Sequence, residues 1–455
     1  MCDHQNTQLH TALFKDDGKE AVAFLLCGKT SYDDQHRLLV KEVITVPDSA
    51  YVHRAVDEVK WNTAFLIPYL ERIEKECLSL VKCHSHPGGL PIFSKLDNIS
   101  DQSFLPDCYQ WNPDGLHASL VFTESSAAGR VVTENGDFTS VDEIISIGQT
   151  IRWLNKPVLK PTPEDQTRFV QAFGEQTYTL MNQIRVAVIG ASGTGSLLIE
   201  SLARTGVGEI YIFDPEIVEW LNLNRVLHAT KDDADNKRYK TTIAAENIHH
   251  MGLGTRVVEF TSDIQHPDMI LALASAHIII GAVDNRETRQ LLSRVSTFYL
   301  LPYIDMGVAI RASEETGNIE SISAAIHYVL PGQSFIQRNI FNYEQLRVEA
   351  LARTDPDEYD ALIKQKYIKG VSVNNPAVMP LNMITAGMAV MELIDRLHGI
   401  RTDPEYASES MLVWDHGVMS QKSDPGDDPA LIKHLGKGDV TPLLGMPAMT
   451  GDEAA

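Results

Sequence analysis

The sequence has few cysteines, few cationic residues and no long apolar run. Its five cysteines all lie between Cys2 and Cys108, and no two of them are spaced as C-x-x-C, which excludes a disulfide framework and a cysteine zinc ribbon. No apolar run approaches about 18 residues, and Met1 to Lys15 lack a basic region followed by an apolar block. We therefore expect neither a membrane span nor a signal peptide, and we expect a cytoplasmic protein.

The shortage of cations makes the chain acidic. It has 39 Lys and Arg against 61 Asp and Glu, which gives a formal net charge of −22. Broad contact with nucleic acid is not expected, because phosphates must be neutralised by Lys and Arg. The length of 455 residues, with 44% hydrophobic and 22% charged residues, is typical of a globular protein with two or three domains.

A glycine-rich turn near the middle of the chain indicates a phosphate site. The segment 185–204 begins with a short β-branched run and continues with helical composition, which predicts a strand, a tight turn and a helix. Glycines let the backbone approach a polyphosphate, and a helix start offers unpaired N–H groups. The next apolar run ends in Asp214, where an acid can bind a ribose hydroxyl. The glycines of this turn are Gly190, Gly193 and Gly195.

Polar residues further along favour ATP over a dinucleotide. Asn222 and Arg225 lie in N-L-N-R, Lys240 begins a helical stretch, and Asp284 follows an apolar run. These cations and acids suit a triphosphate with its metal better than hydride transfer. From about Arg168 to about His398 the chain resembles the ThiF/MoeB adenylyltransferase superfamily, which includes the ubiquitin-activating enzymes.

This resemblance implies a Rossmann-like, doubly wound α/β domain that converts ATP and a carboxylate into an acyl-adenylate and pyrophosphate. It also implies a homodimer, in which Arg168 reaches the nucleotide of the other subunit; a solvated helix arginine is the alternative. The implied roles are phosphate lining for Gly190, Gly193 and Gly195 and ribose binding for Asp214. Asn222 would bind the triphosphate, Arg225 and Lys240 would bind it and take part in catalysis, and Asp284 would be a catalytic magnesium ligand.

The chain departs from this family where many relatives carry P-G-x-x-C-x-x-C. Phe335 and Arg338 stand at the two cysteine positions, and no cysteine follows Cys108. A thioester within this domain is therefore impossible. Either the adenylate passes directly to a nucleophile on a partner, or the cysteine belongs to a separate carrier protein. The upstream Cys27, Cys77 and Cys83 are interpreted as buried residues of strands.

The first 155 residues have a pattern of mixed strands and helix that predicts a separate α/β unit. A predicted strand ends in His84-Ser85-His86-Pro87, and Asp97 follows on the returning segment. Three such ligands can hold zinc and leave a position for water, whose pKa the metal would lower. An isolated H-x-H pair is more often solvated or part of a core, so the longer string carries the interpretation.

The full string H-S-H-P-x6-S-x-x-D resembles the signature of the JAMM metalloprotease family, which includes deubiquitinases. By this match His84, His86 and Asp97 would bind zinc and Ser94 would stabilise an oxyanion. Glu20 would be the general base. For Glu20, a solvated position in a turn before a strand is the alternative.

These observations predict the domain organisation. The proline-rich segment 156–165 is the predicted linker. It would join a JAMM-type α/β metalloprotease domain at 1–155 to a ThiF-type domain at 166–425, and 426–455 would be a loosely ordered tail.

Three further expectations concern the second domain. Residues 343–369 are predicted to be a charged helical segment, and 371–397 an apolar helix. Arg289 is interpreted as pairing with an acid on a neighbouring helix.

Together the two halves predict a bacterial ubiquitin-like system, in which the zinc peptidase trims or removes a small protein tag and the second domain adenylates its C-terminus. Fusion would raise the local concentration of the trimmed product. The alternative is activation of a sulfur carrier or peptide for cofactor or natural-product synthesis, with the JAMM domain maturing the carrier. Inactive domains that only bind a ubiquitin-like fold are a third hypothesis.

Overall fold

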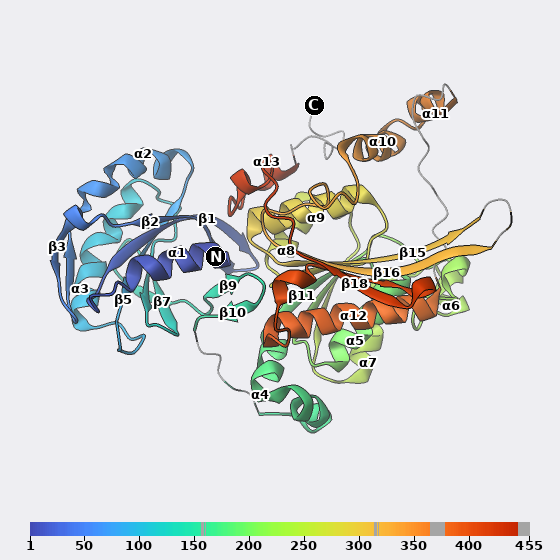
Figure 1. The fold of residues 1–455 in the computed structure, drawn as a ribbon, viewed down its shortest axis with the longest axis horizontal. Helices are drawn as coiled ribbons and strands as arrows, with labels where there is room; N and C mark the ends of the chain where they lie inside the picture. The colour runs from blue at the N-terminus through green and yellow to red at the C-terminus, as the bar shows by residue number, and fades with distance from the viewer. Residues whose placement is uncertain (156–158, 160, 314–315, 317, 365–377, 445–455) are drawn as a thin grey trace. The chain divides into compact units, whose positions relative to one another are not determined.

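The computed structural model describes residues 1–155, 159, 161–313, 316, 318–364 and 378–444 (Figure 1). The chain folds into two compact units, mainly Met1–Pro157 and mainly Val158–Thr297 with Leu301–Lys433. Within the described residues, no helix has the length and hydropathy needed to cross a membrane. Part of the predicted linker and the N-terminal part of the predicted helix at 371–397 lie outside the described residues.

The first unit is built on a six-stranded sheet in the order β2-β1-β5-β6-β7-β8. Strands β5 and β6 are parallel, and the other neighbours are antiparallel. Two small hairpins accompany this sheet, β3 with β4 and β9 with β10. The elements are α1 (Asp3–Leu13), β1 (Val22–Tyr32), β2 (Gln35–Thr45), β3 (Tyr51–Arg54), β4 (Val59–Trp61), α2 (Ile67–Lys75), β5 (Ser79–Ser85), α3 (Lys95–Phe104), β6 (Ala118–Phe122), β7 (Ala127–Val132), β8 (Phe138–Ser140), β9 (Ile145–Ile147) and β10 (Ile151–Trp153).

Strand β1 is buried on both faces of this sheet. Alternate side chains of a strand point to opposite faces. Leu25 therefore joins the core cluster that contains Leu13 of α1, whereas Phe24 joins the cluster that contains Ile73 of α2. This two-sided burial explains why Ala21 to Cys27 reads as a continuous apolar run.

The second unit is a doubly wound α/β fold, as the sequence predicted. Its eight strands lie in the order β13-β12-β11-β14-β15-β16-β17-β18, and the neighbours from β13 to β15 are parallel. Helices α8 and α9 lie on one face and α5, α7 and α12 on the other (Figure 1). The helices are α4 (Thr167–Gln183), α5 (Gly193–Arg204), α6 (Lys231–Asp235), α7 (Lys240–Met251), α8 (Pro267–Ala274), α9 (Arg286–Tyr299), α10 (Tyr343–Thr354), α11 (Pro356–Lys364), α12 (Met379–His398) and α13 (Val440–Leu444). The strands are β11 (Arg185–Ile189), β12 (Glu209–Phe213), β13 (Arg256–Phe260), β14 (Ile278–Gly281), β15 (Tyr303–Ala312), β16 (Ile319–Val329), β17 (Glu409–Val413) and β18 (Val418–Lys422).

The chain reverses its direction of winding between β11 and β14. The connections after these two strands leave toward opposite sides, which opens a crevice at their carboxyl ends. The glycine turn follows β11, and the segment with Asp284 follows β14. Gly190 has φ of +94°, and a Cβ there would lie 2.7 Å from the Ala282 carbonyl oxygen. Only glycine allows the two segments to approach this closely.

The cysteines differ in one respect from expectation. Cys27 and Cys83 are buried, but Cys77 is exposed. It follows α2 with φ of +51°, before β5 begins at Ser79, so it lies in a turn and not in a strand. The prediction that Cys77 is a buried strand residue is therefore wrong.

A thiol titration will check this arrangement. Burial raises the pKa of the Cys27 and Cys108 thiols to about 12 and that of Cys83 well above its usual range. We expect one fast-reacting thiol per chain in the native protein and all five after denaturation. Cys77→Ser should remove the fast phase. A fast phase that survives this substitution would mean that another cysteine is accessible.

Of the segment 343–369 predicted to be helical, residues 343–364 are helical, in two helices because the chain breaks at Asp355 before Pro356, and 365–369 lie outside the described residues. Two other predictions are corrected in the second unit. Arg289 pairs with Asp305 of strand β15, with Nε 3.2 Å from Oδ1, and not with a helix residue. The segment predicted as a loose tail contains helix α13 with buried Leu443, because its apolar residues pack; 445–455 lie outside the described residues.

The Pro331–Arg338 segment, where many relatives carry two cysteines, is held to its neighbours by non-covalent contacts. The guanidinium of Arg338 donates to the carbonyl oxygens of Tyr328 (2.7 Å) and Ser408 (3.0 Å). Phe335 is fully buried, and its ring centroid lies 5.9 Å from that of Tyr303. An arginine and an aromatic ring therefore join this segment to the neighbouring strands.

Candidate metal and nucleotide sites

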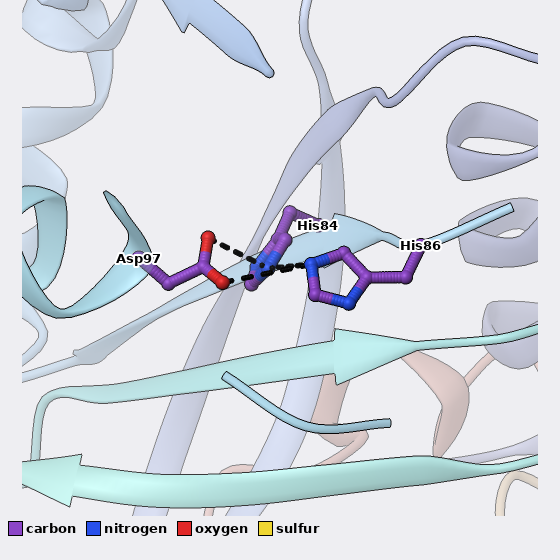
Figure 2. A group of neighbouring side chains, drawn as sticks. All are labelled: His84, His86 and Asp97. Carbon is purple, nitrogen blue, oxygen red and sulfur yellow. Dashed lines mark hydrogen bonds and ion pairs between the residues drawn. The ribbon is translucent and has the colours of Figure 1, made fainter. Parts of the chain in front are cut away.

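His84, His86 and Asp97 gather at the end of strand β5, and their side chains point toward one another (Figure 2). His84 lies in the strand, His86 directly follows it, and Asp97 lies in the first turn of α3. His84 Nε2 lies 3.2 Å from His86 Nε2 and 3.1 Å from Asp97 Oδ1. His86 Nε2 lies 3.5 Å from Asp97 Oδ2.

This geometry fits a tetrahedral metal ion. Ligands about 2.0–2.1 Å from zinc at tetrahedral angles lie about 3.3 Å from one another. The two imidazole nitrogens are separated by 3.2 Å, close to that value, and the Asp97 carboxylate places one oxygen 3.1 Å from His84 Nε2 and the other 3.5 Å from His86 Nε2. His86 Nδ1 lies 3.2 Å from the Leu90 carbonyl oxygen, and donation of its proton there leaves the Nε2 lone pair for a metal. The donor set is therefore suitable for zinc, with one position left for water.

Glu20 faces this group because of strand register. β1 and β5 are antiparallel with Val22 opposite His84, so Glu20, two residues earlier, lies opposite His86. Its Oε1 is 3.6 Å from His86 Nε2. The side chain is buried, which contradicts the alternative of a solvated turn residue.

The electrostatics follow from this burial. Burial raises the pKa of Glu20 to about 7, and nearby Asp97 adds to the rise while His86 opposes it. Burial also lowers the pKa of His84. For Asp97, burial favours the neutral form, but hydrogen bonds with His84 and His86 outweigh it and hold the pKa well below its usual range. The resulting centre has an ionised Asp97 between two imidazoles.

Ser94 begins helix α3. Its Oγ accepts the backbone N–H of Asp97 at 3.1 Å, and its own N–H donates to Asp97 Oδ2 at 2.6 Å. This capping box stabilises the first turn of the helix and directs the Asp97 carboxylate. The Ser94 hydroxyl proton is left to donate elsewhere, as the oxyanion role requires.

A buried charged network below the metal ligands was not predicted from the sequence. Asp101 lies one helical turn after Asp97 and is fully buried. It forms ion pairs with Lys82, two residues before His84 on β5, and with Arg130 of β7, whose Nη2 lies 2.6 Å from Oδ2. In the sequence, the D-x-x-x-D spacing on α3 and the K-x-H spacing on β5 were the patterns that could have indicated this network. The network fixes α3 against the sheet and so sets where Asp97 lies.

Replacing Arg130 by methionine should destabilise the first unit. Methionine has a similar length but also loses the cation–π contacts of the guanidinium, whose Cζ lies 3.8 Å from the ring centroid of Phe93 and 3.9 Å from that of Phe138. It removes one of two cations from Asp101, and a broken buried ion pair costs about 3 kcal/mol. Denaturant unfolding should show this loss, with weaker zinc binding. The control Arg152→Met removes an exposed ion pair with Asp3 and should cost under about 1 kcal/mol. Equal effects of the two substitutions would contradict the proposed role of the network.

In the second unit the glycine turn lies as predicted between β11 and α5. A Cβ on Gly195 would lie 1.9 Å from the Gly190 carbonyl oxygen, so Gly195 allows the turn to close. Helix α5 begins at Gly193, and its N-cap Ser192 makes no side-chain capping bond. The first N–H groups of such a helix are available to an anion.

Asp214 and Lys240 lie beside this turn. Asp214 Oδ2 accepts the Ala191 N–H at 2.7 Å, and burial raises the pKa of its carboxyl although Lys240 opposes the rise. Lys240 is 3% exposed and forms an ion pair with Glu216. The structure thus brings a buried cation and a buried acid to the carboxyl end of β12.

The other predicted residues differ in their surroundings. Arg225 flanks Gly193, where a Cβ would lie 3.1 Å from Arg225 Cδ. Asn222 is buried and accepts the Glu219 N–H at 3.0 Å through Oδ1.

Asp284 is exposed after β14, two residues beyond the carbonyl that Gly190 approaches. Arg168 is exposed on α4, where Nη1 lies 3.4 Å from Gln171 Oε1, and within the described part of the chain no hydrogen bond or ion pair joins it to the other predicted site residues.

Comparison with known proteins finds relatives of both parts of the chain. A model described as the ThiF family matches residues 164–422, and one described as prokaryotic homologs of the JAB domain matches residues 4–131. The chain is 29% identical over 124 residues to the sulfur carrier protein ThiS adenylyltransferase of Bacillus subtilis (strain 168), covering 27% of this chain and 37% of that protein. It is 24% identical over 294 residues to ubiquitin-like modifier-activating enzyme 5 of Aedes aegypti, covering 62% and 67%.

The chain therefore spans little more than a third of the first relative. Among solved structures, E. coli MccB is similar at 17% identity and a TM-score of 0.44, with 58% of this chain and 71% of that chain covered. Both families inferred from the motifs are confirmed. With its match extending over more than half of the sequence, the chain belongs to the ThiF family and begins with a domain related to prokaryotic JAB proteins.

Proposed function

We propose that the second unit adenylates the C-terminal carboxylate of a small protein or peptide and that the first unit is a zinc peptidase acting on the same substrate. Membership of the ThiF family supports adenylation. The observation that carries the proposal is the meeting of Gly190, the uncapped start of α5 and the buried Lys240 at one end of the sheet. The domain limits 1–155 and 166–425 are part of this proposal.

In the adenylating unit the chain positions charges and supplies no covalent nucleophile. Glycine turn N–H groups and Lys240 would bind ATP phosphates, and Asp214 would bind the ribose. Arg225 and Asn222 would hold the triphosphate, and Asp284, exposed at the mouth of the crevice, would bind the magnesium that accompanies it. The substrate carboxylate forms a bond to the α-phosphorus while the bond to pyrophosphate breaks.

In the peptidase unit, His84, His86 and Asp97 would hold zinc. When bound, zinc would lower the pKa of a water molecule, so that the water can lose a proton near neutral pH and attack a peptide carbonyl. Glu20 would accept the proton of that water, since its Oε1 lies 3.6 Å from His86 Nε2. Ser94 would donate its hydroxyl proton to the developing oxyanion.

The absence of cysteine after Cys108 limits how the adenylate is used. The second unit cannot form a thioester with itself. The adenylate would therefore pass to a nucleophile on a partner or to the cysteine of a separate carrier. Similarity to enzymes named for ThiS and for ubiquitin-like modifiers supports a small protein substrate in a ubiquitin-like system.

A paired assay tests this function. The protein, incubated with an adenylate-trapping nucleotide, should retain a polypeptide whose C-terminus mass spectrometry identifies. That polypeptide should then support ATP–pyrophosphate exchange, and a C-terminally extended form should be cleaved in a zinc-dependent reaction. Retention of no polypeptide, together with no ATP binding, would refute adenylation.

Two alternatives lead to different outcomes of this assay. In activation for cofactor or natural-product synthesis, the trapped molecule is a sulfur carrier or short peptide, and the JAMM domain matures it. Inactive binding modules would hold a ubiquitin-like protein without zinc or turnover.

A homodimer is also proposed, in which Arg168 contacts the nucleotide of the other subunit. If the protein has a monomeric mass in solution, Arg168 does not belong to the site.

A further inference from the structure

Asn382 on helix α12 has no role in the function proposed so far. Its side chain is 1% exposed. Neither Nδ2 nor Oδ1 has a hydrogen-bond partner among the residues that the structure describes. A buried amide without partners destabilises a folded protein, so its presence calls for a binding partner that satisfies it.

The position of Asn382 relates it to the start of helix α5. A Cβ built on Gly193, the first residue of α5, would lie 2.5 Å from Asn382 Nδ2 and 3.1 Å from Arg225 Cδ. The amide and the arginine therefore flank the same glycine. This is a second reason for glycine at this position, because any larger residue would displace the Asn382 amide.

The start of α5 by itself is only a general anion site. Its N-cap Ser192 makes no side-chain bond, and the first N–H groups of a helix have no partner within the helix. The buried amide beside it adds an N–H donor in a fixed direction, and a phosphate oxygen can accept a hydrogen bond from it. Backbone N–H groups, a neutral amide and the Arg225 guanidinium would then surround one phosphate group.

We propose that Asn382 binds a phosphate oxygen of the nucleoside triphosphate at the start of α5. This inference rests on the proposed adenylating function and extends its binding site to a helix more than 180 residues away in sequence. Asn382 donates through Nδ2, and its burial keeps the amide in place before the nucleotide arrives.

Two substitutions test this role in the full-length protein with ATP and MgCl2 as the probe. Asn382→Leu has similar volume and removes an unsatisfied amide, so the melting temperature without ATP should stay equal or rise. Its affinity for ATP should fall about 10- to 100-fold, because a hydrogen bond to a charged group is lost. Asn382→Asp keeps the size but replaces the donor by a negative charge, and we expect the weaker ATP binding of the two.

The matched control is Thr385→Val, one turn along α12. Thr385 is also buried, but its hydroxyl already donates to the Leu381 carbonyl oxygen at 2.8 Å, so ATP binding should not change. If Asn382→Leu lowers the melting temperature and leaves ATP affinity unchanged, the amide is structural and the inference is wrong. If the unsubstituted protein does not bind ATP, the proposed adenylating function fails instead.

Discussion

Replacing Lys240 by methionine is expected to lower the affinity for ATP by about 100-fold, because a charge-assisted hydrogen bond to a phosphate is lost. The rate of ATP–pyrophosphate exchange should fall by about 10²–10³, because a donor to a developing charge is lost. Lys240 is 3% exposed and starts helix α7 beside Asp214. Methionine fills the same space without the charge. Calorimetric titration with ATP and MgCl2, followed by ATP–pyrophosphate exchange with the trapped substrate, measures both effects.

The partner of Lys240 gives the control. Glu216 forms an ion pair with Lys240 through a largely exposed carboxylate, which would compete with a phosphate for the cation. Glu216→Gln should therefore bind ATP as tightly as the native protein or more tightly. If Lys240→Met binds ATP normally, the buried cation is a structural partner of Glu216, and the assignment of this residue to the triphosphate is refuted.

Replacing His84 by alanine is expected to reduce bound zinc from about one ion per chain to less than about a tenth, since two ligands do not make a stable zinc site. His84 is the buried member of the cluster, and its Nε2 lies within 3.2 Å of both other ligands. Zinc per chain, measured by atomic absorption after dialysis, checks the result, and zinc-dependent cleavage should be lost with it.

Two comparisons separate this effect from unfolding. His36→Ala changes an exposed histidine in the β1–β2 hairpin and should leave zinc content unchanged. His84→Ala should bind ATP normally, and Lys240→Met should keep its zinc, because the two sites belong to different units. Zinc retained at about one ion per chain in His84→Ala would mean that the metal binds elsewhere.

Most of the local structure could be predicted because it depends on short segments. The β-branched runs at Arg185–Ile189 and Glu209–Phe213 became β11 and β12 with the predicted limits. The glycine turn and the H-S-H-P string lie at strand ends, where the pattern of apolar residues placed them. Such features need only the conformational preferences of neighbouring residues.

Other features depend on pairing between distant segments. Whether Glu20 is buried beside His86 follows from the register of β1 against β5, which a residue-by-residue pattern does not contain. Cys77 belongs to an apolar-looking run but lies in a turn, because β5 begins two residues later. Arg289 was expected to find its partner on a helix, yet Asp305 reaches it from a parallel strand.

The sequence alone determined the two families, the order of the units and the residue types able to bind zinc and ATP, because these are encoded in contiguous motifs. Tertiary structure decided which side chains support them. Lys82, Asp101 and Arg130 meet only when α3 packs on the sheet. Asn382 meets Gly193 only when α12 packs on α5, and its unsatisfied amide is a property of that burial. Burial and partners are set by the packing of distant elements, and no local pattern of residues specifies them.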